Sequence, residues 1–257
     1  MKAIILAGGL GTRLTEETVL RPKPMVEIGG RPILWHILKI YSHHGINDFI
    51  ICLGYKGYLI KEYFANYALH EADVTINLKD GAIKTHRTEC EDWRVTLVDT
   101  GAETMTGGRL RRVLPYVAEE EAVCFTYGDG VANVNIAELI AHHKKRSRLV
   151  TLTAVQPTGK YGALDIGDDG LAREFTEKPR GDRRWVNGGF FVLSPRVAEY
   201  LEGDSTVWER EPLESMARNG QVNVYKHEGY WQSMDTVFER NLLDRQWTSG
   251  NAPWKVW

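Results

Sequence analysis

The amino-acid sequence predicts an α/β fold, in which helices flank a mostly parallel sheet. Apolar, strand-like runs alternate with amphipathic, helix-like segments through the first half of the chain, and a glycine-rich turn follows the first of these runs. Because parallel strands need crossover connections, this alternation indicates right-handed strand–helix–strand units. At 257 residues the chain can bury a sizeable core, and we expect a single domain over 1–257.

The first half has the clearest pattern. Pro32 is tolerated in the first turn of a helix and Gly45 can end one, which sets the bounds of the first long helix. The pair Asp80-Gly81 between two short strand-like runs indicates a hairpin. The expected strands are 2–7, 48–53, 74–78, 82–85, 93–99, 122–127 and 149–155, and the expected helices are 32–44, 58–67, 108–117 and 135–145.

The second half changes character. Segments 162–166, 171–177 and 186–193, with a turn at 168–170, are expected to form an antiparallel, β-rich insertion that acts as a lid. Two helices at 195–201 and 211–219, a strand at 221–226 and a last helix from Asp235 follow. The tail, 246–257, contains three tryptophans and could either cover the core or form an interface.

Composition excludes several classes of protein. The chain has 32 Lys and Arg against 34 Asp and Glu, so no global basic field predicts nucleic-acid binding. No apolar stretch approaches membrane-spanning length, and we expect no membrane association. Cys52 and Cys124 lie inside apolar runs and are expected to be buried free thiols, as in a reducing cytoplasm. The eight histidines have no zinc-type spacing.

The glycine-rich turn after the first strand predicts an anion site. Its sequence is Gly8-Gly9-Leu10-Gly11-Thr12-Arg13-Leu14. Glycine lets the backbone N–H groups approach a phosphate closely, and Arg13 can hold it. The turn lacks the third glycine of a dinucleotide fingerprint, where Leu14 stands, and it has no P-loop Gly-Lys-Ser/Thr. A plain β-turn with a surface arginine is the alternative.

Further side chains stand where phosphate chemistry would use them. Lys23 lies between two prolines, which stiffen the segment that presents it. Asp129 lies between two glycines after the strand at 122–127, where a carboxylate can reach Mg²⁺. Asp235 is a second carboxylate candidate, but an aspartate before a helix is also a good N-cap, and the sequence leaves both possibilities open. Asn187-Gly188 offers an amide and open backbone suited to sugar hydroxyls, or a β-bulge.

Taken together, these motifs resemble those of the sugar-1-phosphate nucleotidyltransferase family. The resemblance runs in order along nearly the whole chain. It covers Leu6-Ala7-Gly8-Gly9-Leu10-Gly11-Thr12-Arg13-Leu14, Pro22-Lys23-Pro24-Met25, Gly128-Asp129-Gly130, Glu177-Lys178-Pro179, Asn187-Gly188-Gly189, and Trp231 with Asp235-Thr236. It implies a Rossmann-like fold, a nucleotide-binding half over about 1–130, a sugar-phosphate-binding half over about 131–245 and a small sugar-binding lid. It also implies a homo-oligomer, with a trimer or hexamer possible.

Within the family, four stretches are most similar to the branch that uses CTP. They are Ile33-Leu34-Trp35-His36, Gly54-Tyr55-Lys56-Gly57, 95–101 and Met105-Thr106-Gly107-Gly108-Arg109. The spacing from Asp99 to Arg109 departs from that of the thymidylyl- and uridylyltransferases. The resemblance implies that CTP and α-D-glucose 1-phosphate give CDP-glucose and pyrophosphate, which supplies dideoxyhexose sugars of bacterial O-antigen.

The resemblance also implies roles for individual residues. Arg13 and Lys23 would neutralise the triphosphate, with Asp129 completing the catalytic set, and Asp129 and Asp235 would hold Mg²⁺. Lys178 would bind the sugar phosphate, with Asn187 and Gly188 beside it. The nucleotide would be bound by Leu6, Ala7, Gly8, Gly9, Leu10, Gly11, Thr12, Arg13, Lys23, Thr104, Arg109 and Gly128.

Three alternatives remain at this point. A uridylyl- or thymidylyltransferase would keep the fold and change the base. A glycosyltransferase would be expected to carry an Asp-x-Asp motif, where this chain has Gly128-Asp129-Gly130. A non-catalytic regulatory homologue would be expected to have lost Arg13, Lys23 or an aspartate, and all are present.

Overall fold

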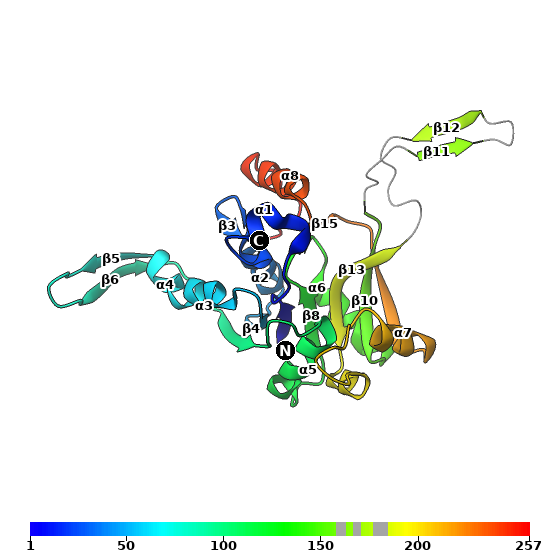
Figure 1. Ribbon diagram of the computed structural model, residues 1–257, viewed down its shortest axis with the longest axis horizontal. Coiled ribbons are helices and arrows are strands. Elements are labelled where there is room, and N and C mark those ends of the chain that lie inside the picture. The colour runs from blue at the N-terminus through cyan, green and yellow to red at the C-terminus, as the bar shows by residue number, and fades with distance from the viewer. Residues whose placement is uncertain (158–162, 167–170, 177–184) are drawn as a thin grey trace.

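A seven-stranded sheet forms the centre of the protein (Figure 1). The computed structural model describes residues 1–157, 163–166, 171–176 and 185–257. The strands of the sheet are β1 (Ala3–Leu6), β4 (Asp48–Leu53), β7 (Arg94–Asp99), β8 (Val123–Tyr127), β10 (Val150–Val155), β13 (Val186–Leu193) and β14 (Val222–His227). Their order is β14-β10-β13-β8-β1-β4-β7. β13 is antiparallel to β8 and β10, and the other pairings within the sheet are parallel.

Helices cover both faces of this sheet. Successive side chains of a strand point to opposite faces, so the residues of one strand belong alternately to two apolar clusters. Ala3 and Ile5 of β1 pack with α2 and α6, whereas Ile4 and Leu6 pack with α5 and α7. The α-helices are α1 (Thr15–Thr18), α2 (Ile33–His43), α3 (Gly57–Ala65), α4 (Tyr67–His70), α5 (Thr106–Val113), α6 (Ile136–Arg146), α7 (Glu211–Arg218) and α8 (Val237–Thr248). Short 3-10 helices are η1 (Thr12–Leu14), η2 (Lys23–Met25), η3 (Leu114–Val117) and η5 (Pro195–Tyr200).

Four two-stranded sheets surround the centre. They are β2 (Glu27–Ile28) with β3 (Arg31–Pro32), β5 (Ala72–Ile76) with β6 (Ile83–Thr88), β9 (Gly130–Ala132) with β15 (Trp231–Ser233), and β11 (Ala163–Ile166) with β12 (Ala172–Thr176). The hairpins β5–β6 and β11–β12 project from the body (Figure 1). No helix within the described ranges is long and apolar enough to cross a membrane.

The predicted α/β fold is confirmed, and one element differs in place. We expected 186–193 to belong to the β-rich insertion, but β13 is a central strand of the main sheet, between β10 and β8. Its last six residues are all buried, the pattern of a strand covered on both faces. Of the expected insertion, the structure describes the antiparallel hairpin β11–β12. The predicted turn at 168–170 lies outside the described residues, and the role of the hairpin as a lid stays a prediction.

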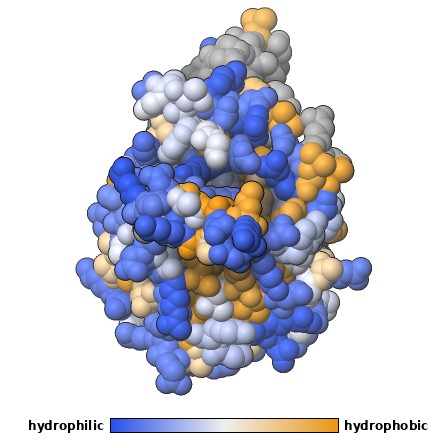
Figure 2. Space-filling model, turned by 90° about the vertical axis from the view of Figure 1, so that its left-hand side faces the viewer, coloured by the Kyte–Doolittle hydropathy of each residue, from blue (hydrophilic) through white to orange (hydrophobic). Residues whose placement is uncertain are grey.

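The hairpin β5–β6 carries apolar side chains into solvent. Leu78, between its two strands, is 92% exposed, and Ile76 and Ile83 are also exposed. Figure 2 views the molecule from this end and shows apolar residues gathered near the middle of a largely hydrophilic face. Exposed apolar side chains that gather in this way are typical of surfaces that bind another protein.

The tryptophan-rich tail covers the core, which is one of the two possibilities left by the sequence. Trp254 is fully buried and stacks on Tyr230 and on Trp247. Trp247 and Trp257 pack around His36 of α2. The last residues of the chain thereby extend the hydrophobic core against α2. Cys52 and Cys124 are buried free thiols, as expected.

The imidazole of His36 is enclosed by this aromatic cluster. Nε2 lies 2.9 Å from the carbonyl of Ile28 and Nδ1 lies 3.4 Å from Nε1 of Trp254. Since the indole N–H can only donate, Nδ1 accepts and Nε2 carries the proton, so the ring is neutral. Burial is the main cause that lowers the pKa of His36 to about 4.

This pKa predicts a loss of stability in acid. The unfolded chain takes up a proton near pH 6.5 while the folded chain stays neutral, so stability present above pH 6.5 falls as the pH approaches about 4, by about 3 kcal/mol. Urea unfolding of the wild type and of His36→Gln between pH 7.5 and 4.5 measures the loss, which should be smaller in the variant. Equal losses in both proteins, or an NMR titration of His36 near pH 6.5, would contradict the assignment.

Candidate active site

A pocket opens where the order of the strands reverses. β1 is flanked by β4 on one side and β8 on the other, and it is parallel to both. Leu6 and Tyr127, the last residues of β1 and β8, are register partners, so the loops that follow them leave the same edge of the sheet. Open α/β sheets bind ligands at such a switch point. The cavity there has a volume of about 520 Å³.

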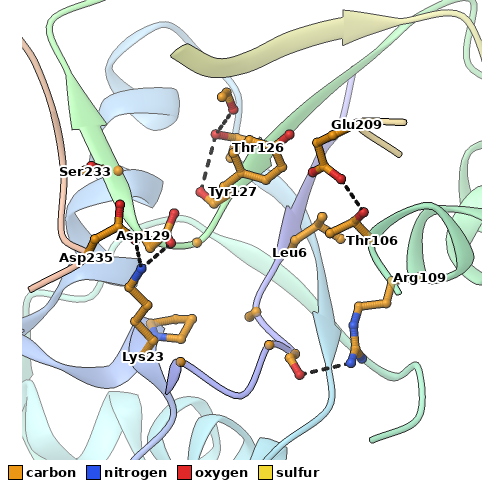
Figure 3. Close-up of a pocket in the computed structure, with 18 of the residues that line it drawn as sticks. Leu6, Lys23, Thr106, Arg109, Thr126, Tyr127, Asp129, Glu209, Ser233 and Asp235 are labelled. Carbon is orange, nitrogen blue, oxygen red and sulfur yellow. Dashed lines mark hydrogen bonds and ion pairs between the residues drawn. The ribbon is translucent and has the colours of Figure 1, made fainter. Parts of the chain in front are cut away.

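Lys23 and two aspartates form an ion-paired cluster in this pocket (Figure 3). The Nζ atom of Lys23 lies 2.5 Å from Oδ2 of Asp129 and 2.8 Å from Oδ1 of Asp235. Lys23 lies in η2, where Pro22 in extended geometry precedes it and Pro24 follows. The prolines fix the backbone of η2, from which the side chain of Lys23 enters the pocket. These three residues were all expected at the site, and the structure brings them together.

Backbone pairing places the two aspartates side by side. Asp129 directly precedes β9, and Gly130 of β9 pairs with Ser233 of β15. The N–H of Met234 donates to the carbonyl of Asp129 at 2.8 Å. Asp235 is the next residue, so this short antiparallel ladder fixes the separation of the two carboxylates.

The charge of Lys23 is set by two opposing effects. Burial alone lowers its pKa, but the adjacent carboxylates of Asp129 and Asp235 outweigh burial and raise the pKa above its ordinary value. Lys23 is therefore protonated at neutral pH. With both carboxylates ionised, the cluster carries a formal charge of −1 and can accept a further cation.

Asp235 is not the N-cap of α8. Thr236 caps the helix, because its hydroxyl accepts from the N–H of Glu239 and the carboxylate of Glu239 accepts from the N–H of Thr236. The carboxylate of Glu239 also accepts from the N–H of Asp235 at 2.7 Å. The capping box thus leaves the side chain of Asp235 directed at Lys23, which excludes the N-cap role for Asp235, while its role as a metal ligand stays a prediction.

The donor set fits a hard divalent cation that is shared with a substrate. Asp129 and Asp235 already converge on one cation, the ammonium of Lys23. Within the ranges that the structure describes, no three His, Cys, Asp or Glu side chains gather as a metal site. Mg²⁺ is commonly bound by one or two carboxylates together with substrate phosphates and water. Two carboxylates are therefore enough only if the substrate supplies the other oxygens.

The glycine loop passes over the buried guanidinium of Arg109. The Nη2 atom donates to the carbonyl of Gly8 at 3.0 Å and to that of Ala102 at 3.2 Å. The Nη1 atom donates to Leu53, Thr100 and Gly101, at 3.0, 2.8 and 2.7 Å. Arg109 thereby ties the ends of β1, β4 and β7 together. Its donors point to the protein, although the sequence predicted a direct contact with the nucleotide, so the structure supports a positioning role.

Glycine is required where these segments meet. A Cβ on Gly8 would clash with the guanidinium of Arg109, and a Cβ on Gly128 would lie 2.5 Å from the carbonyl oxygen of Leu6. Gly11 has a φ of +66°, which L side chains rarely adopt. The loop therefore keeps its shape because its glycines allow close backbone packing. Gly9 has no neighbour within 4 Å of such a Cβ.

Most of the other expected residues line the same pocket. These are Leu6, Ala7, Gly8, Gly9, Gly11, Thr12, Thr104, Gly128, Asn187 and Gly188. Leu10 does not line the pocket and is 57% exposed. Arg13 lies in η1, but its side chain is outside what the structure describes. Lys178 lies outside the described residues altogether.

At the pocket wall formed by β13, the amide of Asn187 is held by its neighbours. Its Nδ2 donates to the hydroxyl of Tyr127 at 3.2 Å, and its Oδ1 accepts from the N–H of Gly189 at 2.8 Å. The indole N–H of Trp231 donates to the carbonyl of Gly188 at 2.7 Å. These bonds fix the backbone of β13 at the pocket wall. Gly189 has a φ of +77°, consistent with the bulge that the sequence offered as an alternative.

The sequence analysis missed several polar lining residues. Thr106, Tyr127 and Glu209 all face the pocket, and Ser233 lies near Asp235 (Figure 3). Tyr127 ends the expected strand 122–127, and Thr106 is the first residue of α5, so both could have been found from their place at the edge of the sheet. Glu209 follows a segment without a recognisable motif, so it could not have been found from the sequence.

The chain belongs to the nucleotidyl transferase family, whose model matches residues 2–236. It is 57% identical over 257 residues to the glucose-1-phosphate cytidylyltransferase of Salmonella typhi, with all of both chains covered. It is 44% identical over 260 residues to the probable glucose-1-phosphate cytidylyltransferase of Bacillus subtilis, again with all of both chains covered. The crystal structure of HddC from Yersinia pseudotuberculosis has the same fold, with a TM-score of 0.71 at 22% identity over 96% of this chain and 99% of that one.

The glycine packing can be tested with a matched pair of variants. Gly8→Ala should lower the free energy of unfolding by about 1–3 kcal/mol, because the new methyl group meets a guanidinium that its hydrogen bonds hold in place. Gly9→Ala, with open space around the same methyl group, should change it by less than about 0.5 kcal/mol. Urea unfolding without ligands measures both. Equal effects would show that Arg109 does not constrain the loop.

Proposed function

We propose that the protein transfers a cytidylyl group from CTP to α-D-glucose 1-phosphate, giving CDP-glucose and pyrophosphate. The observation that carries this proposal is the 57% identity, over the full length of both chains, to the glucose-1-phosphate cytidylyltransferase of Salmonella typhi. The pocket supports it, because a glycine loop and a cation between two carboxylates lie at the edge where such folds bind nucleotides.

The reaction brings two polyanions together. The phosphate of the sugar attacks the α-phosphorus of CTP in line, and pyrophosphate leaves. Catalysis of this kind depends mainly on positioning and on neutralising charge. The attacking phosphate is already ionised, so no general base is needed. Lys23 lies in the pocket as a cation between two carboxylates, and we assign it to the phosphates of the nucleotide.

Mg²⁺ is the metal that we propose for this site. Asp129 and Asp235 would hold it, together with substrate oxygens and water. When bound, the ion would neutralise charge on the phosphates. Lys23 would then share its two carboxylate partners with the ion, which favours a contact between its ammonium group and the anionic substrate.

The remaining residues receive roles that fit their positions. The backbone of Leu6, Ala7, Gly8, Gly9, Gly11 and Thr12, together with Gly128, would enclose the nucleotide, and Thr104 would lie against it. Arg109 would hold the loop in shape, while Asn187 and Gly188 would form the sugar-phosphate side. Direct nucleotide contacts of Leu10, Arg13 and Arg109, and the contact of Lys178 with the sugar phosphate, stay predictions.

The setting of the enzyme is also proposed. We infer a cytoplasmic enzyme that forms a homo-oligomer and binds neither nucleic acid nor membrane. The exposed apolar side chains of β5–β6 support self-association, since a second copy of the chain would cover them.

A nucleotide panel tests the activity. Pyrophosphate release with glucose 1-phosphate and Mg²⁺ should be at least about 10-fold faster, as kcat/KM, with CTP than with UTP or dTTP, because a wrong base leaves polar groups of the site unpaired. Lys23→Ala should lose most of this activity, whereas Lys144→Ala, on the exposed face of α6, should retain it.

Preference for UTP or dTTP would replace the cytidylyl assignment with one of the alternatives. Consumption of a nucleotide sugar without pyrophosphate release would indicate a glycosyltransferase instead.

A further inference from the structure

Glu209 is a carboxylate in the pocket for which the proposed reaction gives no role. It lies between η5 and α7, is half-buried, and lines the cavity. The hydroxyl of Thr106 donates to its Oε2 at 2.7 Å, and Thr106 in turn accepts from the N–H of Trp208 at 2.9 Å. The hydroxyl of Tyr127 lies beside the same carboxylate, which helps to raise the pKa of Tyr127. Glu209 is thus held by Thr106 and flanked by Tyr127.

The neighbours of Glu209 leave its carboxylate able to accept further hydrogen bonds. Burial is the largest cause that raises the pKa of Tyr127, and the adjacent carboxylate of Glu209 adds to it, so Tyr127 stays protonated. The side-chain amide of Asn187 donates to the hydroxyl of Tyr127. An ionised carboxylate can accept about four hydrogen bonds; the hydroxyl of Thr106 donates one, and the hydroxyl of Tyr127 is a second donor nearby. About two further donors from a ligand can therefore be bound.

The position of Glu209 along the pocket indicates which part of a nucleotide it would meet. Asp129 lies two residues beyond Tyr127, Tyr127 contacts Glu209, and Glu209 contacts Thr106 at the start of α5, which Arg109 follows. Figure 3 shows the same order in space, with the ion-paired cluster at one side, Tyr127 in the middle, and Glu209, Thr106 and Arg109 toward the other side. Glu209 therefore lies between the phosphate end of the pocket and the end at α5.

We propose that Glu209 accepts hydrogen bonds from the 2′- and 3′-hydroxyls of the ribose and selects ribonucleotides over 2′-deoxyribonucleotides. This inference rests on the proposed function, which places the triphosphate at Lys23 and the rest of the nucleotide against Thr104. The ribose then lies between them, beside Glu209. Vicinal hydroxyls supply the two donors that the carboxylate can still accept, and an acidic residue serves the ribose of dinucleotides in the same way in other α/β folds.

The test compares CTP with dCTP at saturating glucose 1-phosphate. The wild type should prefer CTP by roughly 10- to 100-fold in kcat/KM, the usual effect of one hydrogen bond to a charged group. Glu209→Ala should bring the ratio to near unity by lowering kcat/KM more for CTP, which loses the hydrogen bonds of both hydroxyls, than for dCTP, which loses only that of the 3′-hydroxyl. Glu209→Gln, which keeps one acceptor oxygen, should retain part of the preference. For the wild type, the inhibition constant of dCTP should also be higher than the dissociation constant of CTP, and this comparison needs no variant.

Thr106→Ala is the matched control for a purely structural role. It removes a support of Glu209 and keeps the carboxylate, so it should lower kcat/KM for CTP and dCTP by similar factors and preserve their ratio. If Glu209→Ala does the same, Glu209 only fastens α5 and the inference is wrong. A changed ratio of CTP to UTP would assign Glu209 to the base, and a raised KM for glucose 1-phosphate alone would assign it to the sugar; both would overturn the inference. A wild type without turnover of CTP would instead contradict the proposed function itself.

Discussion

The ion pairs of Lys23 with Asp129 and Asp235 are the interaction on which the site depends. The three residues come from η2, the turn after β8 and the approach to α8, so they connect parts of the chain separated by 106 and 212 residues. Two prolines fix the lysine, and the ladder between β9 and β15 fixes the aspartates. The pocket can be assembled only when the sheet, the loop and the last helix are all in place.

Charge explains why this cluster suits phosphate transfer. One ammonium between two carboxylates has a formal charge of −1, which repels a triphosphate, and a divalent cation on the same carboxylates would change the sign to +1. The cluster therefore becomes an anion site only with its proposed metal. The glycine loop completes the pocket wall, and Arg109 uses its own donors to hold that loop.

The sequence predicted those features that depend on local pattern. The alternation of strands and helices, the proline-flanked Lys23 and the glycine-flanked Asp129 each depend on neighbouring residues, and the structure bears out their placement. The central place of β13 could not be predicted, because an antiparallel strand in the middle of a sheet is decided by its partners β8 and β10. The same limit applies to Glu209, which reaches the pocket through contacts with Thr106 and Tyr127, about 100 and 80 residues away in sequence.

The start of α8 shows both what residue type predicts and what only the folded structure decides. Asp235 and Thr236 are both good caps by residue type, and only the capping box with Glu239 decides in favour of Thr236. That choice directs the carboxylate of Asp235 toward Lys23. Local helix chemistry and the assembly of the site are thus coupled through two adjacent residues.

A double-mutant cycle on Lys23 and Asp235 tests this account most directly. The free energies of unfolding of the wild type, Lys23→Ala, Asp235→Asn and the double variant, measured in urea without metal or nucleotide, give the coupling between the two side chains. We expect a favourable coupling of about 0.5–3 kcal/mol, as for side chains in one ion-paired network. A coupling of zero within error would show that the ion pair does not join the two ends of the chain, and it would contradict the account.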